Sequence, residues 1–249
     1  MPETVASHIQ NARRKGKKKL AVLIDPDQCR GDFLEKVCDS VERAEVDMIF
    51  VGGSLLSNYQ LDQVIGEIKQ RTGARLVLFP GNAFQVSAKA DALLFLSLIS
   101  GRNPELLIGQ QVMAAPLVKQ SAIEVLPTGY MLIDGGRPTT ASYISGSLPI
   151  PADKPQIAAL TALAGSYLGL QYIYMDAGSG AQAPITIEMI KAVREQVDLP
   201  MIVGGGIRDA ETAVSMAEAG ADVIVVGNAT ERNPLIIEEI ARSLHKVKV

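Results

Sequence analysis

The chain has 249 residues, of which 47% are hydrophobic and 20% are charged, and its formal net charge at pH 7 is −3. That charge gives no support for nucleic-acid binding over the whole surface, and the sequence has neither an apolar run of the roughly 18 residues that cross a membrane nor the apolar core of a signal peptide. The two cysteines form neither a disulfide framework nor a set of zinc ligands, so we expect a cytoplasmic protein in a reducing environment.

Short apolar runs alternate with helical patterns along the chain. The first helix is predicted at residues 1–14, and the basic residues 13–19 after it are interpreted as a solvated connection. His8 and His245 are interpreted as exposed helix residues without a catalytic role. Strands are predicted at residues 20–24, 47–51, 75–79, 92–96, 123–133, 170–175, 199–203 and 222–226, and helices at 32–44, 58–70, 104–119, 154–167 and 235–244, with further helical patterns following 170–175 and 199–203.

Three segments depart from regular alternation. Too few residues separate the strands at 75–79 and 92–96 for a full crossover helix, so a shortened helix or an extended segment is expected near residues 83–89. The strand at 123–133 is expected to be broken or bent at Pro127-Thr128-Gly129. Residues 134–151 are rich in Gly, Pro, Ser and Thr and are predicted to form a long loop, of a length that is usually functional in a compact domain.

Eight strands that alternate with crossovers indicate a parallel sheet. Eight such units in 249 residues favour a closed barrel over an open doubly wound sheet, and no GxGxxG motif follows the first strand, where a dinucleotide-binding fold requires it. We therefore predict an α/β fold in which residues 1–249 form a single TIM (β/α)8 barrel domain, with helix 3 shortened or replaced by an extended segment.

Glycine-rich turns follow the last three predicted strands, at residues 174–180 (YMDAGSG), 204–206 (GGG) and 227–228 (GN). Glycine lets backbone N–H groups approach a ligand closely, and TIM barrels commonly bind phosphate in the loops after strands seven and eight. The glycines could instead serve only to make tight turns. Three such turns at one mouth of the barrel favour a phosphate site.

Asp25 and Ser54 stand at the ends of the first two predicted strands. Neighbouring strands lie about 4.8 Å apart, so the two side chains could share one divalent cation. Carboxylate and hydroxyl oxygens, together with water, suit Mg2+, especially when it bridges to a diphosphate. The alternative assigns Asp25 to the turn before Pro26 and Ser54 to a helix N-cap.

Asp176 ends the sixth strand, immediately before a glycine-rich turn. A carboxylate repels phosphate, so its presence at the rim of a phosphate pocket is explained if it accepts a proton from a hydroxyl of the same ligand. Tyr174 lies on the same face of that strand. A role for Asp176 in capping the turn stays open. Residues 93–99, with Phe79 and Phe84, could line a groove for a long hydrocarbon or belong to the ordinary core.

Together these motifs resemble the geranylgeranylglyceryl phosphate synthase family, which includes bacterial heptaprenylglyceryl phosphate synthases. The resemblance runs from about residue 20 to residue 244, and it rests on several motifs rather than on any one of them. The matching residues are 23–27 (LIDPD), 50–54 (FVGGS), 79–82 (FPGN), 174–180 (YMDAGSG), 203–207 (VGGGI) and 226–228 (VGN).

The resemblance implies a phosphoglycerol geranylgeranyltransferase type of enzyme. It would use Mg2+ to form an ether bond between sn-glycerol 1-phosphate and a polyprenyl diphosphate, with geranylgeranyl diphosphate the favoured donor, and would release diphosphate. By motif, Mg2+ is assigned to Asp25 and Ser54, and the catalytic base to Asp176. Substrate binding is assigned to Tyr174, Met175, Asp176, Ala177, Gly178, Ser179, Gly180, Gly205, Gly206, Gly227 and Asn228.

Two positions depart from the family pattern. Asp176 stands where the family usually has Glu, which shortens the reach of the base by one methylene. Leu23 stands where some members have Lys, so any phosphate contact from that Lys is missing or is supplied by another residue such as Arg137 or Arg208. The long loop is similar to that of the longer-chain branch, which implies a homo-oligomer. A transient contact with a membrane surface, a phosphosugar isomerase or lyase activity, and a non-catalytic phosphate-binding barrel stay open as alternatives.

Overall fold

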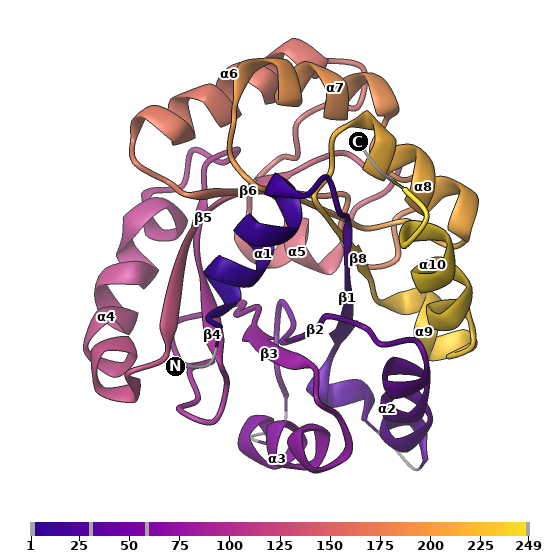
Figure 1. Ribbon diagram of the computed structural model, residues 1–249. Coiled ribbons are helices and arrows are strands. Elements are labelled where there is room, and N and C mark those ends of the chain that lie inside the picture. The colour runs from indigo at the N-terminus through magenta and orange to yellow at the C-terminus, as the bar shows by residue number, and fades with distance from the viewer. Residues whose placement is uncertain (1–2, 30–31, 58–59, 248–249) are drawn as a thin grey trace.

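Eight parallel strands close into a barrel in a computed structural model that describes residues 3–29, 32–57 and 60–247 (Figure 1). Each strand pairs with the next along the chain, and β8 pairs with β1. This arrangement confirms the predicted TIM barrel. The strands are β1 (Lys19–Ile24), β2 (Met48–Val51), β3 (Arg75–Leu78), β4 (Ala92–Leu98), β5 (Glu124–Leu132), β6 (Tyr172–Asp176), β7 (Met201–Gly204) and β8 (Val223–Val226).

Helices ring the barrel and cover its outer face (Figure 1). The expected starts at Met1 and Asn58 lie outside the described residues. Among the described residues, no helix combines the length and the apolar character that a membrane crossing needs. The helices are α1 (Val5–Arg14), α2 (Phe33–Arg43), α3 (Leu61–Arg71), α4 (Gln110–Ser121), α5 (Thr140–Ser145), α6 (Pro155–Tyr167), α7 (Ile187–Gln196), α8 (Ala210–Ala219), α9 (Asn228–Arg232) and α10 (Ile236–Leu244), with a 3-10 turn at Pro26–Gln28 and a π-helical turn at Glu105–Gly109.

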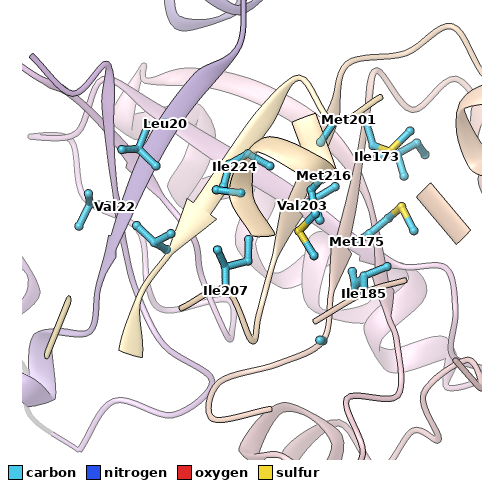
Figure 2. Packing of buried hydrophobic residues seen from close by; sticks show 14 of the residues in the cluster. Leu20, Val22, Ile173, Met175, Ile185, Met201, Val203, Ile207, Met216 and Ile224 are labelled. Carbon is cyan, nitrogen blue, oxygen red and sulfur yellow. The ribbon is translucent and has the colours of Figure 1, made fainter. Parts of the chain in front are cut away.

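Alternate residues of each strand face two separate cores. The outer core lies between strands and helices, and Figure 2 shows a part of it in which side chains of β1, β6, β7 and β8 lie beside Ile207 and Met216. The inner core fills the barrel and includes Phe50, Tyr172 and Tyr174. Burying one large apolar side chain stabilises the fold by about 1.5–3 kcal/mol. Because both faces of every strand are buried, apolar residues occupy consecutive strand positions and not only alternate ones.

No helix forms between β3 and β4, where residues 79–91, all of them described, make turns and bends. This confirms the expected departure. The Gln85 side chain holds the segment against the turn after β2. Its side-chain nitrogen donates to the Gly53 carbonyl at 3.1 Å, and its side-chain oxygen accepts from Gly81 N–H at 3.1 Å. Because no helix covers this side, the space beside β4 is left accessible.

Two expectations for the middle of the chain need correction. The expected break at Pro127 does not occur: β5 runs unbroken with Pro127 opposite Phe95 of β4, since the strand loses only one N–H donor at proline and stays paired with β4 before and after it. Residues 134–151 are not all loop, because α5 forms within them. Thr139 and Ser142 make a reciprocal capping box at the start of α5, a signal that the sequence contains.

α1 closes the N-terminal end of the barrel, where Val5 and Ile9 pack against the inner core (Figure 1). Glu124, the first residue of β5, accepts hydrogen bonds from the N–H groups of Val5 and Ala6 at 2.7 and 3.2 Å. The expectation that His8 is an exposed residue is wrong, because its side chain is 15% exposed and lies against Glu3 and Asp47. With this end closed, a ligand must enter at the other end.

Candidate active site

A cavity of about 700 Å3 opens at the C-terminal ends of the strands, where TIM barrels carry their active sites. The turns after β1, β2, β3, β6, β7 and β8 all contribute to its walls. The predicted site residues that line it are Asp25, Ser54, Tyr174, Asp176, Gly178, Ser179, Gly180, Gly205, Gly206, Gly227 and Asn228.

Met175 and Ala177 are the two predicted substrate-binding residues that do not line the cavity. Their side chains are buried in the outer core. The reason is the two-residue period of a strand: Tyr174 and Asp176 face the inside of the barrel, so Met175 faces outward. A role for Met175 and Ala177 in substrate binding would therefore rest on their backbone groups and not on their side chains.

The turns after β6 and β8 are tied together by Asn228. Its side-chain oxygen accepts hydrogen bonds from the Ser179 hydroxyl at 2.9 Å and from Gly180 N–H at 3.0 Å. Between these turns, the N–H groups of Gly205 and Gly206 donate to no acceptor among the described residues. Unpaired backbone donors beside a fixed loop are suited to an anion such as phosphate.

Glycine is required at positions 205 and 206 because the turns after β6 and β7 touch backbone to backbone. A Cβ on Gly205 would lie 2.7 Å from Gly178 N, and one on Gly206 would lie 2.8 Å from Ala183 O. Both residues also have positive φ, +85° and +73°. No side chain fits there without separating the two turns.

Gly205→Ala is therefore expected to lower the free energy of unfolding by about 1–3 kcal/mol and to weaken binding of inorganic phosphate. Gly66 of α3 is the matched control, since a Cβ there meets nothing within 4 Å and alanine should stabilise the helix by about 0.5–1 kcal/mol. Denaturant unfolding and calorimetric titration with phosphate measure both effects. Unchanged stability and phosphate affinity in Gly205→Ala would contradict the close packing.

Asp176 is held by two hydrogen bonds. The Tyr130 hydroxyl donates to one carboxylate oxygen at 2.7 Å, and Gly178 N–H donates to the other at 2.7 Å. Burial raises the pKa of Asp176 above its ordinary value, and the two hydrogen bonds oppose that shift because they favour the ionised form. The two hydrogen bonds fix the carboxylate in one orientation, and the raised pKa makes it a stronger base than an ordinary aspartate.

Aromatic rings support this carboxylate from inside the barrel. Tyr174 stacks on Phe79 with ring centroids 4.9 Å apart and meets Tyr130 edge to face at 5.6 Å. Burial and the nearby Asp176 raise the pKa of both tyrosines well above the ordinary value, so both hydroxyls stay protonated and able to donate. Sequence reasoning missed Tyr130, although its position opposite Tyr174 in the β5–β6 register brings it to the site.

Asp25 and Ser54 both line the cavity. Asp25 also makes the predicted turn contact, accepting from Asp27 N–H at 3.0 Å. A Cβ on Gly53 would lie 3.2 Å from the Asp25 carboxylate, so glycine lets that carboxylate lie against the turn that carries Ser54. Neighbouring Asp27 instead accepts from the Ser57 N–H and hydroxyl, at 2.6 and 2.8 Å.

These donors fit Mg2+ shared with a substrate. Among the described residues, no group of three or more His, Cys, Asp or Glu side chains could enclose a metal ion. Mg2+ commonly needs only one or two carboxylates, with water and substrate phosphate oxygens completing its octahedron. One carboxylate and one hydroxyl at the wall of a large cavity leave room for such ligands.

The cavity continues into an apolar region beside β4. Leu93, Phe95 and Leu96 line it, and so does Phe79. Three residues proposed for this groove do not line the cavity: Phe84, which is 79% exposed, Ser97, and Ile99, which belongs to the outer core. Residues 79–91 form no helix between β3 and β4, which leaves this side of the cavity open, while α4 and the π-helical turn before it contact β4.

Known proteins are similar to this chain in sequence and in fold. The model of the PcrB family matches residues 13–248. A geranylgeranylglyceryl phosphate synthase of Chitinophaga pinensis is 54% identical over 233 residues, covering 94% of this chain and 92% of that protein, and one of Korarchaeum cryptofilum is 40% identical over 222 residues, covering 89% and 91%.

A solved structure is similarly close. The crystal structure of (S)-3-O-geranylgeranylglyceryl phosphate synthase from Thermoplasma acidophilum, in complex with its substrate sn-glycerol-1-phosphate, has a TM-score of 0.91 at 33% identity, covering 98% of this chain and 99% of that one. These similarities confirm the resemblance found in the motifs. With a family model that spans nearly its whole length, the chain belongs to the PcrB family.

Proposed function

We propose that this protein is a prenyltransferase that joins sn-glycerol 1-phosphate to a polyprenyl diphosphate through an ether bond. One observation carries the proposal: unpaired backbone donors, a fixed buried carboxylate, a pair of Mg2+-type ligands and an apolar groove all open into one cavity. An isomerase or lyase acting on a phosphosugar would use the first two features but would have no need of the groove.

In this mechanism the phosphate of the acceptor is held by Gly205 and Gly206 N–H, in the space that Asn228 keeps in shape. Asp176 accepts the proton of the glycerol hydroxyl as its oxygen forms the new bond to the allylic carbon. The bond from that carbon to the diphosphate breaks, and the diphosphate leaves with the electron pair. Mg2+ bound by Asp25 and Ser54 would neutralise the charge on that leaving group. Holding both reactants in one cavity supplies much of the rate.

The surface of α4 and α6 supports the further proposal of a homo-oligomer. Large apolar side chains are exposed along both helices, and such patches mark contact surfaces. A second copy of the chain is the partner we propose. The exposed residues of the two helices are Val112, Met113, Leu117, Ile157, Leu160 and Tyr167, with Ile108 in the π-helical turn before α4 and Leu168 directly after α6.

Cytoplasmic location is also a proposal. Among the described residues, Cys29 and Cys38 are free thiols, and burial raises the pKa values of these thiols to about 12 and about 11. A reducing compartment is where thiols persist. We also propose that residues 1–249 form one barrel domain, since the described helices pack on the same closed sheet.

An extraction assay tests the function. Purified protein is mixed with Mg2+, labelled glycerol 1-phosphate of either stereochemistry, and prenyl diphosphates from geranyl to heptaprenyl. Label that moves into organic solvent only with the sn-1 isomer and Mg2+ is the expected result, and the donor series gives the chain length. Binding of glycerol phosphate with no transfer from any donor would instead favour a non-catalytic phosphate-binding barrel.

Tyr130→Phe is expected to move the acid limb of the kcat/KM profile to higher pH. The hydrogen bond from Tyr130 favours ionised Asp176, so its loss raises further a pKa that burial has already raised. A higher pKa means that Asp176 becomes ionised, and active as a base, only at higher pH. Tyr174→Phe is the control, since among the described residues Tyr174 makes no hydrogen bond to Asp176. An acid limb that stays in place in Tyr130→Phe would exclude Asp176 as the titrating base.

A further inference from the structure

The loop between β5 and α5 is fixed on the turn after β6 at two points. At the first, the Gly135 carbonyl accepts from Gln182 N–H at 2.8 Å and from Ala183 N–H at 3.1 Å. At the second, Thr139 packs so closely on Gly178 that a Cβ there would lie 2.7 Å from the threonine hydroxyl oxygen. The loop backbone between these two points, at Arg137, is therefore held in place.

Arg137 lies between the two anchors, and its guanidinium reaches Gly180. A Cβ on Gly180 would lie 2.5 Å from an Arg137 terminal nitrogen, and both residues line the cavity. The Arg137 side chain is exposed and donates to no acceptor in the part of the chain that the structure describes. A terminal nitrogen of this guanidinium, which carries five N–H donors in all, thus lies at the edge of the proposed phosphate site.

The charged residues around the cavity also bear on which cation would bind a phosphate. Of the described residues that line it, the cations are Arg137 and Arg208, and the acids are Asp25 and Asp176. Arg208 already donates to the Ala181 carbonyl at 2.7 Å. Two cations therefore face two acids around the cavity, and Arg137 is the cation whose side chain donates to no acceptor in the described part of the chain.

We infer that Arg137 binds the phosphate group of the acceptor substrate and sets the preference of the site for phosphorylated over uncharged acceptors. Its guanidinium adds charge-assisted hydrogen bonds to those of the backbone N–H groups of Gly205 and Gly206. This inference deepens the proposed function and rests on it for the identity of the acceptor. The position beside Gly180, in the turn after β6, assigns Arg137 to the phosphate monoester rather than to the diphosphate of the donor.

Titration with inorganic phosphate and steady-state kinetics test this role. Arg137→Gln removes the charge and keeps the length, Arg137→Lys keeps the charge, and Arg242→Gln on the exposed face of α10 is the matched control. We expect Arg137→Gln to weaken phosphate binding and to raise the KM for glycerol 1-phosphate roughly 10- to 100-fold. Lysine should restore part of the loss, and the control should behave as the unmodified protein.

The outcomes separate this inference from the function on which it rests. Unchanged phosphate affinity in Arg137→Gln, or a rise in KM confined to the prenyl diphosphate, would overturn the assignment. So would a failure of the unmodified protein to bind phosphate at all. Phosphate affinity that depends on Arg137 in a protein that transfers no prenyl group would support the binding role and refute the prenyltransferase.

Discussion

Replacing Asp176 by asparagine is expected to lower turnover roughly 100- to 10,000-fold, the contribution of a positioned general base. The amide has almost the same shape as the carboxylate but cannot accept the proton of the glycerol hydroxyl. Affinity for inorganic phosphate should stay nearly unchanged, because the backbone donors of the phosphate site are elsewhere, in the turn after β7. Single-turnover measurements with saturating substrates would separate the chemical step from binding.

The fold should tolerate this change. In the Asp176→Asn variant the amide oxygen accepts from Gly178 N–H, and the amide nitrogen faces Tyr130, whose hydroxyl turns to accept instead of donate. Asp39→Asn, on the exposed side of α2, makes the same change of charge away from the cavity and serves as the control. Near-normal turnover in Asp176→Asn would rule out Asp176 as the base.

Stability provides a second readout of the same variant. A carboxyl group whose folded pKa is raised stabilises the protein below its unfolded pKa and costs stability as pH rises through the folded pKa. Asp176 therefore lowers the free energy of unfolding at neutral pH and not at low pH. Asp176→Asn should raise the melting temperature relative to the unmodified protein more at pH 7 than at pH 4. An equal difference at both pH values would mean that burial does not shift this group.

The barrel and the outline of its mouth could be predicted because they depend on local patterns. Apolar runs of strand length alternate with helical periods, and the glycines at 205 and 206 stand directly after such a run. Parallel strands bring their C-terminal ends to one side, so the residues after each strand gather without further information. Asp25, Ser54 and Asp176 were all found in this way.

Features that depend on register and on side-chain direction could not be predicted. The pairing of Tyr130 with Asp176 follows from the alignment of β5 with β6, which the sequence of neither strand reveals. The bonds from Ser179 and Gly180 to Asn228 join residues far apart in the sequence. His8 was misjudged for the same reason, since its partner Asp47 lies immediately before β2.

Asp25→Asn is expected to lower turnover about 100-fold or more at ordinary Mg2+ concentrations, since losing several kcal/mol of charge stabilisation on the leaving group costs tenfold for each 1.36 kcal/mol. Asp25 is the charged ligand of the proposed Mg2+ site, in which the Ser54 hydroxyl is the neutral one. Asparagine keeps the oxygen that accepts from Asp27 N–H, so the turn is preserved. Raising the Mg2+ concentration should recover part of the loss, because the site is weakened rather than removed.

Asp27→Asn is the matched control, only two positions away. The carboxylate of Asp27 accepts from Ser57 and does not line the cavity, so its replacement should leave the Mg2+ dependence close to that of the unmodified protein. Ser54→Ala should show a smaller shift than Asp25→Asn, since a neutral hydroxyl contributes less than a charged ligand. Turnover measured across a Mg2+ series, with a chelator at the lower end, distinguishes the variants. If Asp25→Asn and Asp27→Asn shift the Mg2+ requirement equally, the Asp25 carboxylate acts through the structure of the turn and not through the ion.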